Sequence, residues 1–331
     1  MSVQPVKIET ISSSKPEVGP DDYRYQDVAA FIEETSGDRI DVSFESKGET
    51  LAGHIYGSGG NEKPGVVLIG PETYVKEQVP AAYAKRLADR GYVALTFDPR
   101  FRGQSGGEPR NLESPLSKID DIHAATAYLE SREDVDPRRI FAIAICQGSS
   151  EMVPAAAEDD RIKAFATLAG HYRDREGDIQ WFGSEEALED RKAAAQEARR
   201  KYDETGEIEV VPAVHKTDAS AGMPGELVWS WYHRWAEEGL PWPNRFAKMS
   251  DAELLNYESM SGSARVHKPY LMFHSDACML PDAAKRHFAA IPDDRKEVEW
   301  WGDIAHLQFY DDARVIDPAT DRIDAFFRQH S

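Results

Sequence analysis

The chain has 331 residues, of which 41% are hydrophobic and 30% charged, and its formal net charge is −20. This composition is typical of a globular protein with a sizeable core and excludes a disordered chain. Phosphate binding needs clustered Lys and Arg, so the negative charge also argues against a protein that binds nucleic acid without regard to sequence.

The two cysteines, Cys146 and Cys278, cannot form a disulfide framework, and no Cys or His spacing fits a zinc site. The N-terminal stretch lacks the apolar segment of a signal peptide, and no later stretch offers about 18 uninterrupted apolar residues. We therefore expect a soluble, cytoplasmic protein that needs no membrane partner.

The predicted elements begin with a polar arm and a short helix over residues 1–38. A hairpin follows in "DRIDVSFES" and "LAGHIYG", with its turn near Lys47 and Gly48. Amphipathic helices then alternate with apolar, strand-like runs at 64–70, 92–98, 139–145, 162–170, 269–275 and 297–303. This alternation predicts the α/β class, with a mostly parallel central sheet and helices on both faces.

Residues 172–266 break the alternation after the sixth strand. A charged, Ala-rich helix is expected between Ser184 as N-cap and Gly206 at its end. Five of the seven tryptophans also lie in this segment: Trp181, Trp229, Trp231, Trp235 and Trp242. The segment is predicted to be a helical cap over the carboxyl edge of the sheet, inserted into a core formed by residues 39–171 and 267–331.

The stretch "FAIAICQGSS" (141–150) predicts a buried strand that ends abruptly at Cys146. Ala144 and Gly148, two residues before and after it, fit the nucleophile elbow, a strand-to-helix turn so tight that larger side chains there would clash. The turn presents its central side chain at a helix N-terminus, where the helix dipole and free N–H groups favour a thiolate. The alternative is that Cys146 is a small hydrophobic residue of the core.

An elbow nucleophile needs an acid and a histidine that follow it in the chain. Asp276 directly follows the strand "PYLMFHS", and His306 comes just after the last strand. His306 is expected to take the thiol proton and later to activate water, while Asp276 fixes the imidazole tautomer. His171 and His274 also lie at strand ends and rival His306, and Asp282 is the alternative acid.

Residues 64–176 resemble the dienelactone-hydrolase-like branch of the α/β-hydrolase superfamily, including its X-Pro-dipeptidyl-peptidase-like relatives. The stretches that carry the resemblance are "VKEQVPAAYAKRLADRGYVALTFD" (75–98), "RGQSGGEPRNLESP" (102–115), "DPRRIFAIAICQGS" (136–149), "WPNRFAKMS" and "IAHLQFYDD". The resemblance implies an α/β-hydrolase fold and hydrolysis of an ester-like bond without a metal or organic cofactor. It also implies that Cys146, Asp276 and His306 form the triad.

By the same resemblance, the oxyanion hole would use the backbone N–H groups of Gln147 and Glu72. Glu72 is similar in placement to the loop glutamate that engages the resting thiol in dienelactone hydrolase, so it could hydrogen-bond Cys146, or it could be an ordinary solvated glutamate. The loop 70–74 departs from the family pattern, because many relatives have His-Gly or His-Pro and then a glycine-rich loop there. Two features of the elbow depart from it as well. Many relatives have Gly where Ala144 stands, and Pro154 falls inside the helix after the nucleophile, where we expect a kink.

A thiolate attacks activated acyl groups well, so we expect an ester, lactone or thioester of a medium-sized, partly aromatic or polyketide-like molecule. The substrate pocket is predicted to include six residues, some of which could instead be packing residues of the cap: Tyr74, His171, Trp229, Trp231, Tyr232 and His274. An acyltransferase or cyclase with the same acyl-enzyme is the first alternative, and a non-catalytic binder of small molecules is the second. The N-terminal arm could embrace a partner subunit, which leaves a homodimer open.

Overall fold

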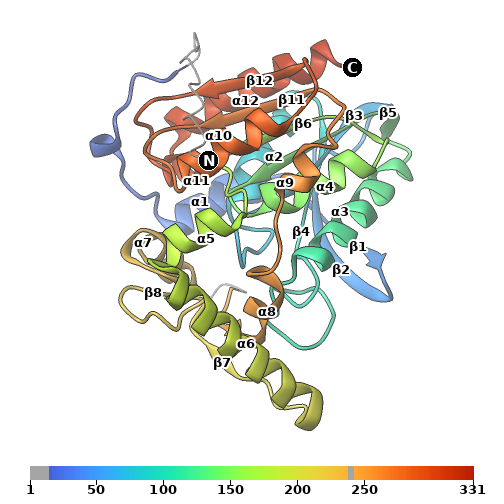
Figure 1. Ribbon diagram of the computed structural model, residues 1–331. Helices are drawn as coiled ribbons and strands as arrows, with labels where there is room; N and C mark the ends of the chain where they lie inside the picture. The colour runs from blue at the N-terminus through green and yellow to red at the C-terminus, as the bar shows by residue number, and fades with distance from the viewer. Residues whose placement is uncertain (1–14, 238–241) are drawn as a thin grey trace.

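The computed structural model describes residues 15–237 and 242–331. Within these two ranges, every helix is too short or too polar to span a bilayer. Its centre is an eight-stranded sheet in the order β1-β2-β4-β3-β5-β6-β11-β12 (Figure 1). The strands are β1 Ile40–Ser46, β2 Glu49–Tyr56, β3 Lys63–Ile69, β4 Val93–Phe97, β5 Val135–Ile145, β6 Ile162–Leu168, β11 Tyr270–His274 and β12 Lys296–Trp300. Only β2 pairs antiparallel to its neighbours β1 and β4, so the predicted mostly parallel sheet is confirmed.

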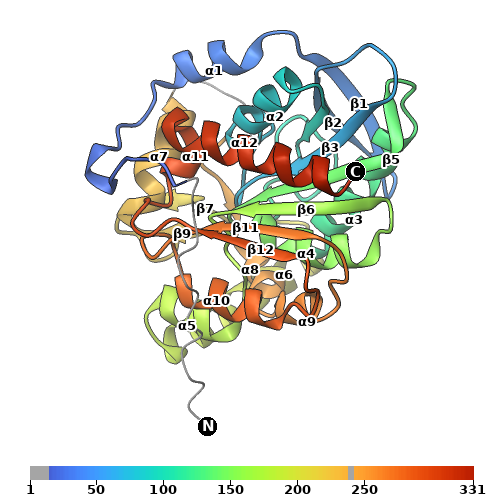
Figure 2. The same ribbon diagram turned by 90° about the horizontal axis from the view of Figure 1, so that it is seen from above.

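Helices cover both faces of the sheet (Figure 2). One face carries α1 Val28–Ser36, α2 Val79–Asp89, α11 Gln308–Asp311 and α12 Ala313–Gln329; the other carries α3 Pro115–Glu130, α4 Gly148–Glu158 and α10 Pro281–Ala290. Because a central parallel strand is packed on both sides, its sequence is continuously apolar. Every residue from 140 to 145 of β5 is fully buried, which explains the run that ends at Cys146.

In its described residues, the segment between β6 and β11, predicted as a helical cap, contains helices and four short strands. The helices are α5 Arg175–Phe182, α6 Glu185–Thr205, α7 Glu226–Glu237, α8 Asp251–Leu254 and α9 Met260–Ser263, with the 3-10 turn η2 Lys248–Ser250. The strands pair as β7 Val210–Val211 with β10 Phe246–Ala247 and β8 Val214–His215 with β9 Met223–Pro224. Two-residue strands are too short to show alternation, so the sequence pattern did not predict them.

The predicted ends of α6 are confirmed. The Ser184 side chain accepts a hydrogen bond from the Ala187 N–H, and Gly206 takes a left-handed φ of +73° at the C-cap. The hairpin turn is confirmed as well, with positive φ at Lys47 and Gly48.

The first 14 residues of the predicted N-terminal arm lie outside the described residues. The rest contains the 3-10 turn η1 Pro20–Asp22 and α1, and it packs on its own chain. The Tyr23 hydroxyl donates to Asp311, and Phe31 meets the Trp235 ring edge-on at 5.4 Å. The described part of the arm is thus held by α7 and α11.

Pro154 lies inside α4, and the helix is assigned without interruption from Gly148 to Glu158. Proline has no N–H, so the carbonyl of Ser150, four residues earlier, loses its helical partner. The Tyr257 hydroxyl donates to that carbonyl at 2.7 Å and replaces the missing bond.

This replacement predicts a dependence between two substitutions. Tyr257→Phe should lower the free energy of unfolding by about 1–2 kcal/mol, because it leaves the Ser150 carbonyl without a partner. In a Pro154→Ala background the loss should be smaller, since an alanine at that position has a backbone N–H that can supply the bond. Urea unfolding of the four proteins measures the coupling. An equal loss in both backgrounds would contradict this account.

Candidate active site

The register of the parallel strands gathers the predicted site residues at one edge of the sheet. Ile69 of β3 pairs with Ala144 of β5, and Ile145 pairs with Leu168 of β6. Leu168 in turn pairs with Phe273 of β11. Because these strands end side by side, the loops that carry Glu72, Cys146, His171 and Asp276 all begin at the carboxyl edge, where ligands bind in such sheets.

The turn at Cys146 has the geometry of an elbow. Cys146 has a φ of +53°, in the left-handed region that non-glycine residues rarely adopt. The chain that follows β3 lies so close that a Cβ on Gly148 would stand 2.5 Å from the Gly70 carbonyl oxygen. The Gly148 N–H donates to that same oxygen at 3.1 Å. Glycine is therefore required at 148 for β5 to turn into α4 at this point.

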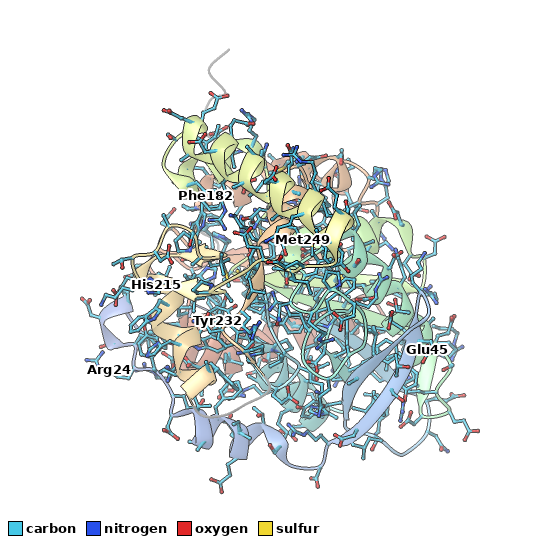
Figure 3. The ribbon with its side chains drawn as sticks, turned by 90° about the horizontal axis from the view of Figure 1, so that it is seen from below. Arg24, Glu45, Phe182, His215, Tyr232 and Met249 are labelled. Atoms are coloured by element: carbon cyan, nitrogen blue, oxygen red, sulfur yellow. The ribbon has the colours of Figure 1, made fainter. Side chains whose placement is uncertain are left out.

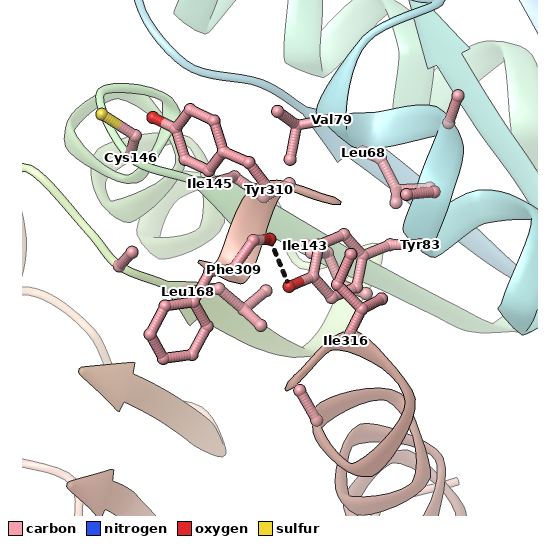
Figure 4. Packing of buried hydrophobic residues seen from close by; sticks show 14 of the residues in the cluster. Leu68, Val79, Tyr83, Ile143, Ile145, Cys146, Leu168, Phe309, Tyr310 and Ile316 are labelled. Carbon is pink, nitrogen blue, oxygen red and sulfur yellow. Dashed lines mark hydrogen bonds between the residues drawn. The ribbon is translucent and has the colours of Figure 1, made fainter. Parts of the chain in front are cut away.

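The Cys146 sulfur faces a nearly closed cavity of about 20 Å³, which is room for about one water molecule. The Tyr310 hydroxyl acts on the thiol and lowers its pKa, and in Figure 4 this hydroxyl points toward Cys146. Burial raises the pKa of the thiol to about 11, while the Tyr310 hydroxyl and the Gln147 N–H act in the opposite direction. The resting group is therefore a protonated thiol at neutral pH.

His306 reaches Cys146 through Tyr310. Its Nε2 lies 3.1 Å from the Tyr310 hydroxyl oxygen, and its Nδ1 accepts from the Met279 N–H at 3.4 Å. Since Nδ1 is an acceptor, the neutral ring carries its proton on Nε2; this tautomer is assigned from the partners. Burial lowers the pKa of His306 to about 3, so the imidazole is neutral at physiological pH.

The predicted acid, Asp276, does not contact His306 within the described ranges. Its carboxylate lies 3.3 Å from Lys285 Nζ, and its side chain is 64% exposed. The alternative acid, Asp282, is also exposed and lies 3.8 Å from Lys285. The position of Asp276 at the end of β11 is as expected. In this structure, however, the Nδ1 of His306 accepts its hydrogen bond from the Met279 N–H and not from a group of Asp276.

Glu72 is paired with Arg173, a residue that the sequence analysis missed. The Glu72 carboxylate accepts from the Arg173 guanidinium at 2.9 Å, and Asp178 and Gln147 bind the same guanidinium at 2.9 Å each. Burial raises the pKa of Glu72 to about 7, with Arg173 acting against the rise. The predicted hydrogen bond from Glu72 to the Cys146 sulfur is not formed here, because the carboxylate is turned toward Arg173.

Two backbone N–H groups fit an oxyanion hole. The Gln147 N–H lies beside the Cys146 sulfur. The Glu72 N–H has no acceptor among the residues that the structure describes, although the Glu72 carbonyl accepts from the Tyr232 hydroxyl at 3.0 Å. These are the two donors that the resemblance implied, and their suitability for an oxyanion stays a prediction.

Of the six predicted pocket residues, His171 and Tyr232 line the cavity. His171 Nε2 is buried without a hydrogen-bond partner in the described part of the chain, so it can bind a ligand atom. The other four pack elsewhere. Tyr74 is fully buried among hydrophobic residues of the core, and Trp229 stacks on His233. The Trp231 N–H donates to Asp311, and both ring nitrogens of His274 face backbone carbonyls.

Several lining residues were not predicted as pocket residues: Arg173, Trp181, Phe182, Met223, Val228, Asp251, Met279 and Tyr310. For Tyr310 a signal was present, because a tyrosine four residues after His306 lies on the same side of a helical turn. The others come from the inserted segment and from loops, whose path over the sheet no local pattern specifies.

Comparisons with known proteins agree with this architecture. Residues 51–198, a little under half of the chain, match the model of the Dienelactone hydrolase family. The crystal structure of hypothetical protein PA2218 from Pseudomonas aeruginosa superposes with a TM-score of 0.76 and 26% identity, covering 88% of this chain and 94% of that one. The fold is that of an α/β-hydrolase.

The curated relatives of this chain carry several names. Uncharacterized protein YcjY of Escherichia coli is 36% identical over 51% of this chain and 56% of its own length. Polyketide transferase claH of Penicillium crustosum is 37% identical over 36% of this chain and 40% of its own. A thiohydrolase of Eupenicillium brefeldianum is 30% identical over 38% and 41%. The chain thus spans about half of these curated relatives or less.

The environment of the sulfur predicts how Cys146 reacts with a small alkylating agent. Only the thiolate reacts, so with a pKa of about 11 the alkylation rate should rise about tenfold per pH unit from pH 7 to 10. Tyr310→Phe removes the hydroxyl that lowers the thiol pKa and should slow alkylation about tenfold at each pH. Iodoacetamide labelling followed by peptide mass spectrometry measures both effects.

Tyr83→Phe is the matched control. Its hydroxyl is also buried, but it donates to the Phe309 carbonyl and leaves the sulfur untouched (Figure 4). A rate that levels off below pH 8, or a Tyr310→Phe protein that reacts as fast as the control, would contradict the assigned environment.

Proposed function

We propose that this α/β-hydrolase is a cysteine-dependent enzyme that cleaves an ester, lactone or thioester through an acyl-enzyme on Cys146. The observation that carries the proposal is the sulfur itself. It stands at the elbow, faces a closed cavity, and has the Gln147 N–H and the Tyr310 hydroxyl beside it. A cysteine that only filled the core would need neither a cavity nor polar neighbours.

In the first step the thiol loses its proton and the sulfur bonds to the substrate's carbonyl carbon. The proton passes from the sulfur to Tyr310 while the Tyr310 proton passes to His306, which works if Nε2 is free to accept. Nε2 becomes free once the ring shifts its proton to Nδ1. Met279 lines the cavity, so a substrate that displaces it also removes the N–H that holds Nδ1 as an acceptor.

The same loop carries the predicted acid. Asp276 lies three residues before Met279, and its exposed carboxylate lies 3.3 Å from Lys285 Nζ. An inward turn of this loop would exchange the Met279 N–H for the Asp276 carboxylate at Nδ1. The proposal therefore gives Asp276 its orienting role in the substrate complex, where catalytic hydrogen bonds often tighten.

In the second step the tetrahedral intermediate breaks down. Its oxyanion is held by the N–H groups of Gln147 and Glu72, and donors of this type are worth about 3 kcal/mol each. The carbon–oxygen or carbon–sulfur bond to the leaving group breaks, and the leaving group takes the proton from His306 through Tyr310. Water then attacks the thioester on Cys146, releases the acid and restores the thiol.

Acyl transfer is the second candidate, because relatives are named polyketide transferase and acyltransferase as well as thiohydrolase. The chemistry up to the acyl-enzyme is the same, and a second nucleophile replaces water. The nearly closed cavity favours this outcome for substrates that exclude water. The product mass decides between the two, since only hydrolysis adds the mass of water to the acyl group.

Turnover of aryl esters, lactones and acyl thioesters by wild type and Cys146→Ala tests the proposal. We expect a loss of at least 10³-fold in kcat/KM for the substrates that the wild type accepts, because the bond-forming atom is gone. Cys278→Ala is the matched control, since Cys278 is equally buried and lies outside the cavity lining. Equal activity of Cys146→Ala and wild type would refute the nucleophile, and binding without turnover in any form would favour the non-catalytic binder.

A further inference from the structure

The cavity at Cys146 is too small for the substrate that the site is proposed to cleave. About 20 Å³ holds the reacting carbonyl and little else, whereas small-molecule sites usually have about 300–1,000 Å³. The remainder of a substrate must therefore lie in a second space that connects with the first.

Such a space lies next to the cavity, within the inserted segment. A pocket of about 430 Å³ is formed by the end of α5, one side of α6 and the chain before α7. It shares three wall residues with the cavity, namely Trp181, Phe182 and Asp251. Figure 3 views the molecule from this side and labels Phe182 beside α6 and Tyr232 on α7. Trp181 and Phe182 thus line both this second space, the outer pocket, and the cavity that the sulfur faces.

The two cations of the outer pocket are already engaged. The Arg191 guanidinium lies 2.7 Å from the Asp251 carboxylate, donates to the carbonyls of Ala219 and Ala221, and stacks 4.6 Å from the Phe182 ring centre. Lys248 Nζ donates to Glu209 at 2.6 Å. With these charges paired, the surface left for a ligand is apolar, and an anionic ligand would have to break existing bonds.

That apolar surface comes from Trp181, Phe182, Ala187, Ala194, Ala219 and Pro224. We propose that the outer pocket binds an uncharged, apolar acyl chain, whose carbonyl passes between Trp181, Phe182 and Asp251 to reach Cys146. This inference rests on the proposed function and adds the substrate class to it: acyl groups of medium length are preferred over acetyl.

The passage requires the Trp181 and Phe182 side chains to turn at the junction. Trp181 and Phe182 are the last two residues of α5, and Gly183 follows in the left-handed region with a φ of +93°. Trp181 and Phe182 are half-buried rather than locked in the core. A chain that lies against them buries about one methylene per added carbon, and each buried methylene should raise kcat/KM about fourfold.

The test compares acetyl, butyryl, hexanoyl and octanoyl thioesters with three proteins. Wild type should prefer octanoyl over acetyl by about 100-fold or more in kcat/KM. Ala194→Trp fills the outer pocket and should lower octanoyl turnover at least tenfold while acetyl turnover stays within about twofold. Ala193→Trp is the matched control, because Ala193 is the preceding residue of α6, is exposed, and does not line the pocket.

Ala187→Phe repeats the test at an exposed position should Ala194→Trp fail to fold. A wild type without chain-length preference, or an Ala194→Trp protein that keeps octanoyl turnover, would overturn the inference. Failure of the proposed function gives a different result, because acetyl turnover would then be the same in wild type and Cys146→Ala. Calorimetry with a non-hydrolysable octanoyl amide tests the pocket without turnover, and equal affinity of wild type and Ala194→Trp would also overturn it.

Discussion

Cys146 holds a left-handed backbone conformation that costs a non-glycine residue about 1–3 kcal/mol, and the bonds around it keep it there. The Cys146 N–H donates to the Leu168 carbonyl, and the Cys146 carbonyl accepts from the His171 N–H. The Gly148 N–H donates to the Gly70 carbonyl. These three contacts tie the chain after β3 and the chain after β6 to one turn. The placement of the sulfur, the start of α4 and the course of the chain at His171 all depend on that turn.

Burial then determines the chemistry of the groups around the sulfur. The pKa of Cys146 is raised and that of His306 is lowered, so neither group is charged at rest. Two neutral groups need a path for the proton, and Tyr310 lies between them. Charge is instead concentrated at the cavity wall, where Glu72 and Asp178 share Arg173. The site thus keeps its reacting groups neutral until a substrate enters.

The sequence predicted the sheet, the elbow and the order of the site loops, because continuous apolar strands and a small–x–Cys–x–Gly turn leave few alternatives. It did not predict which side chains reach the cavity. Trp229 and Trp231 look like pocket residues in a linear sequence, but Trp229 stacks on His233 of the same helix, α7, and the Trp231 N–H donates to Asp311 of α11. Arg173 was missed because its role depends on contacts between distant loops. Tyr310 did carry a local signal, its spacing of four residues from His306, which the prediction did not use. The hydrogen bond from the Met279 N–H to Nδ1 of His306 depends on a loop conformation that the spacing of residues in the sequence does not predict.

The central claim is that Cys146 carries the acyl group during turnover. Acid quenching of the enzyme within milliseconds of mixing with an accepted thioester, followed by peptide mass spectrometry, tests it most directly. The account predicts that the peptide containing Cys146 gains the mass of the acyl group less one hydrogen, and that this adduct decays as product appears. Product formed with Cys146 unmodified at every time point, or an adduct on another residue, would contradict it.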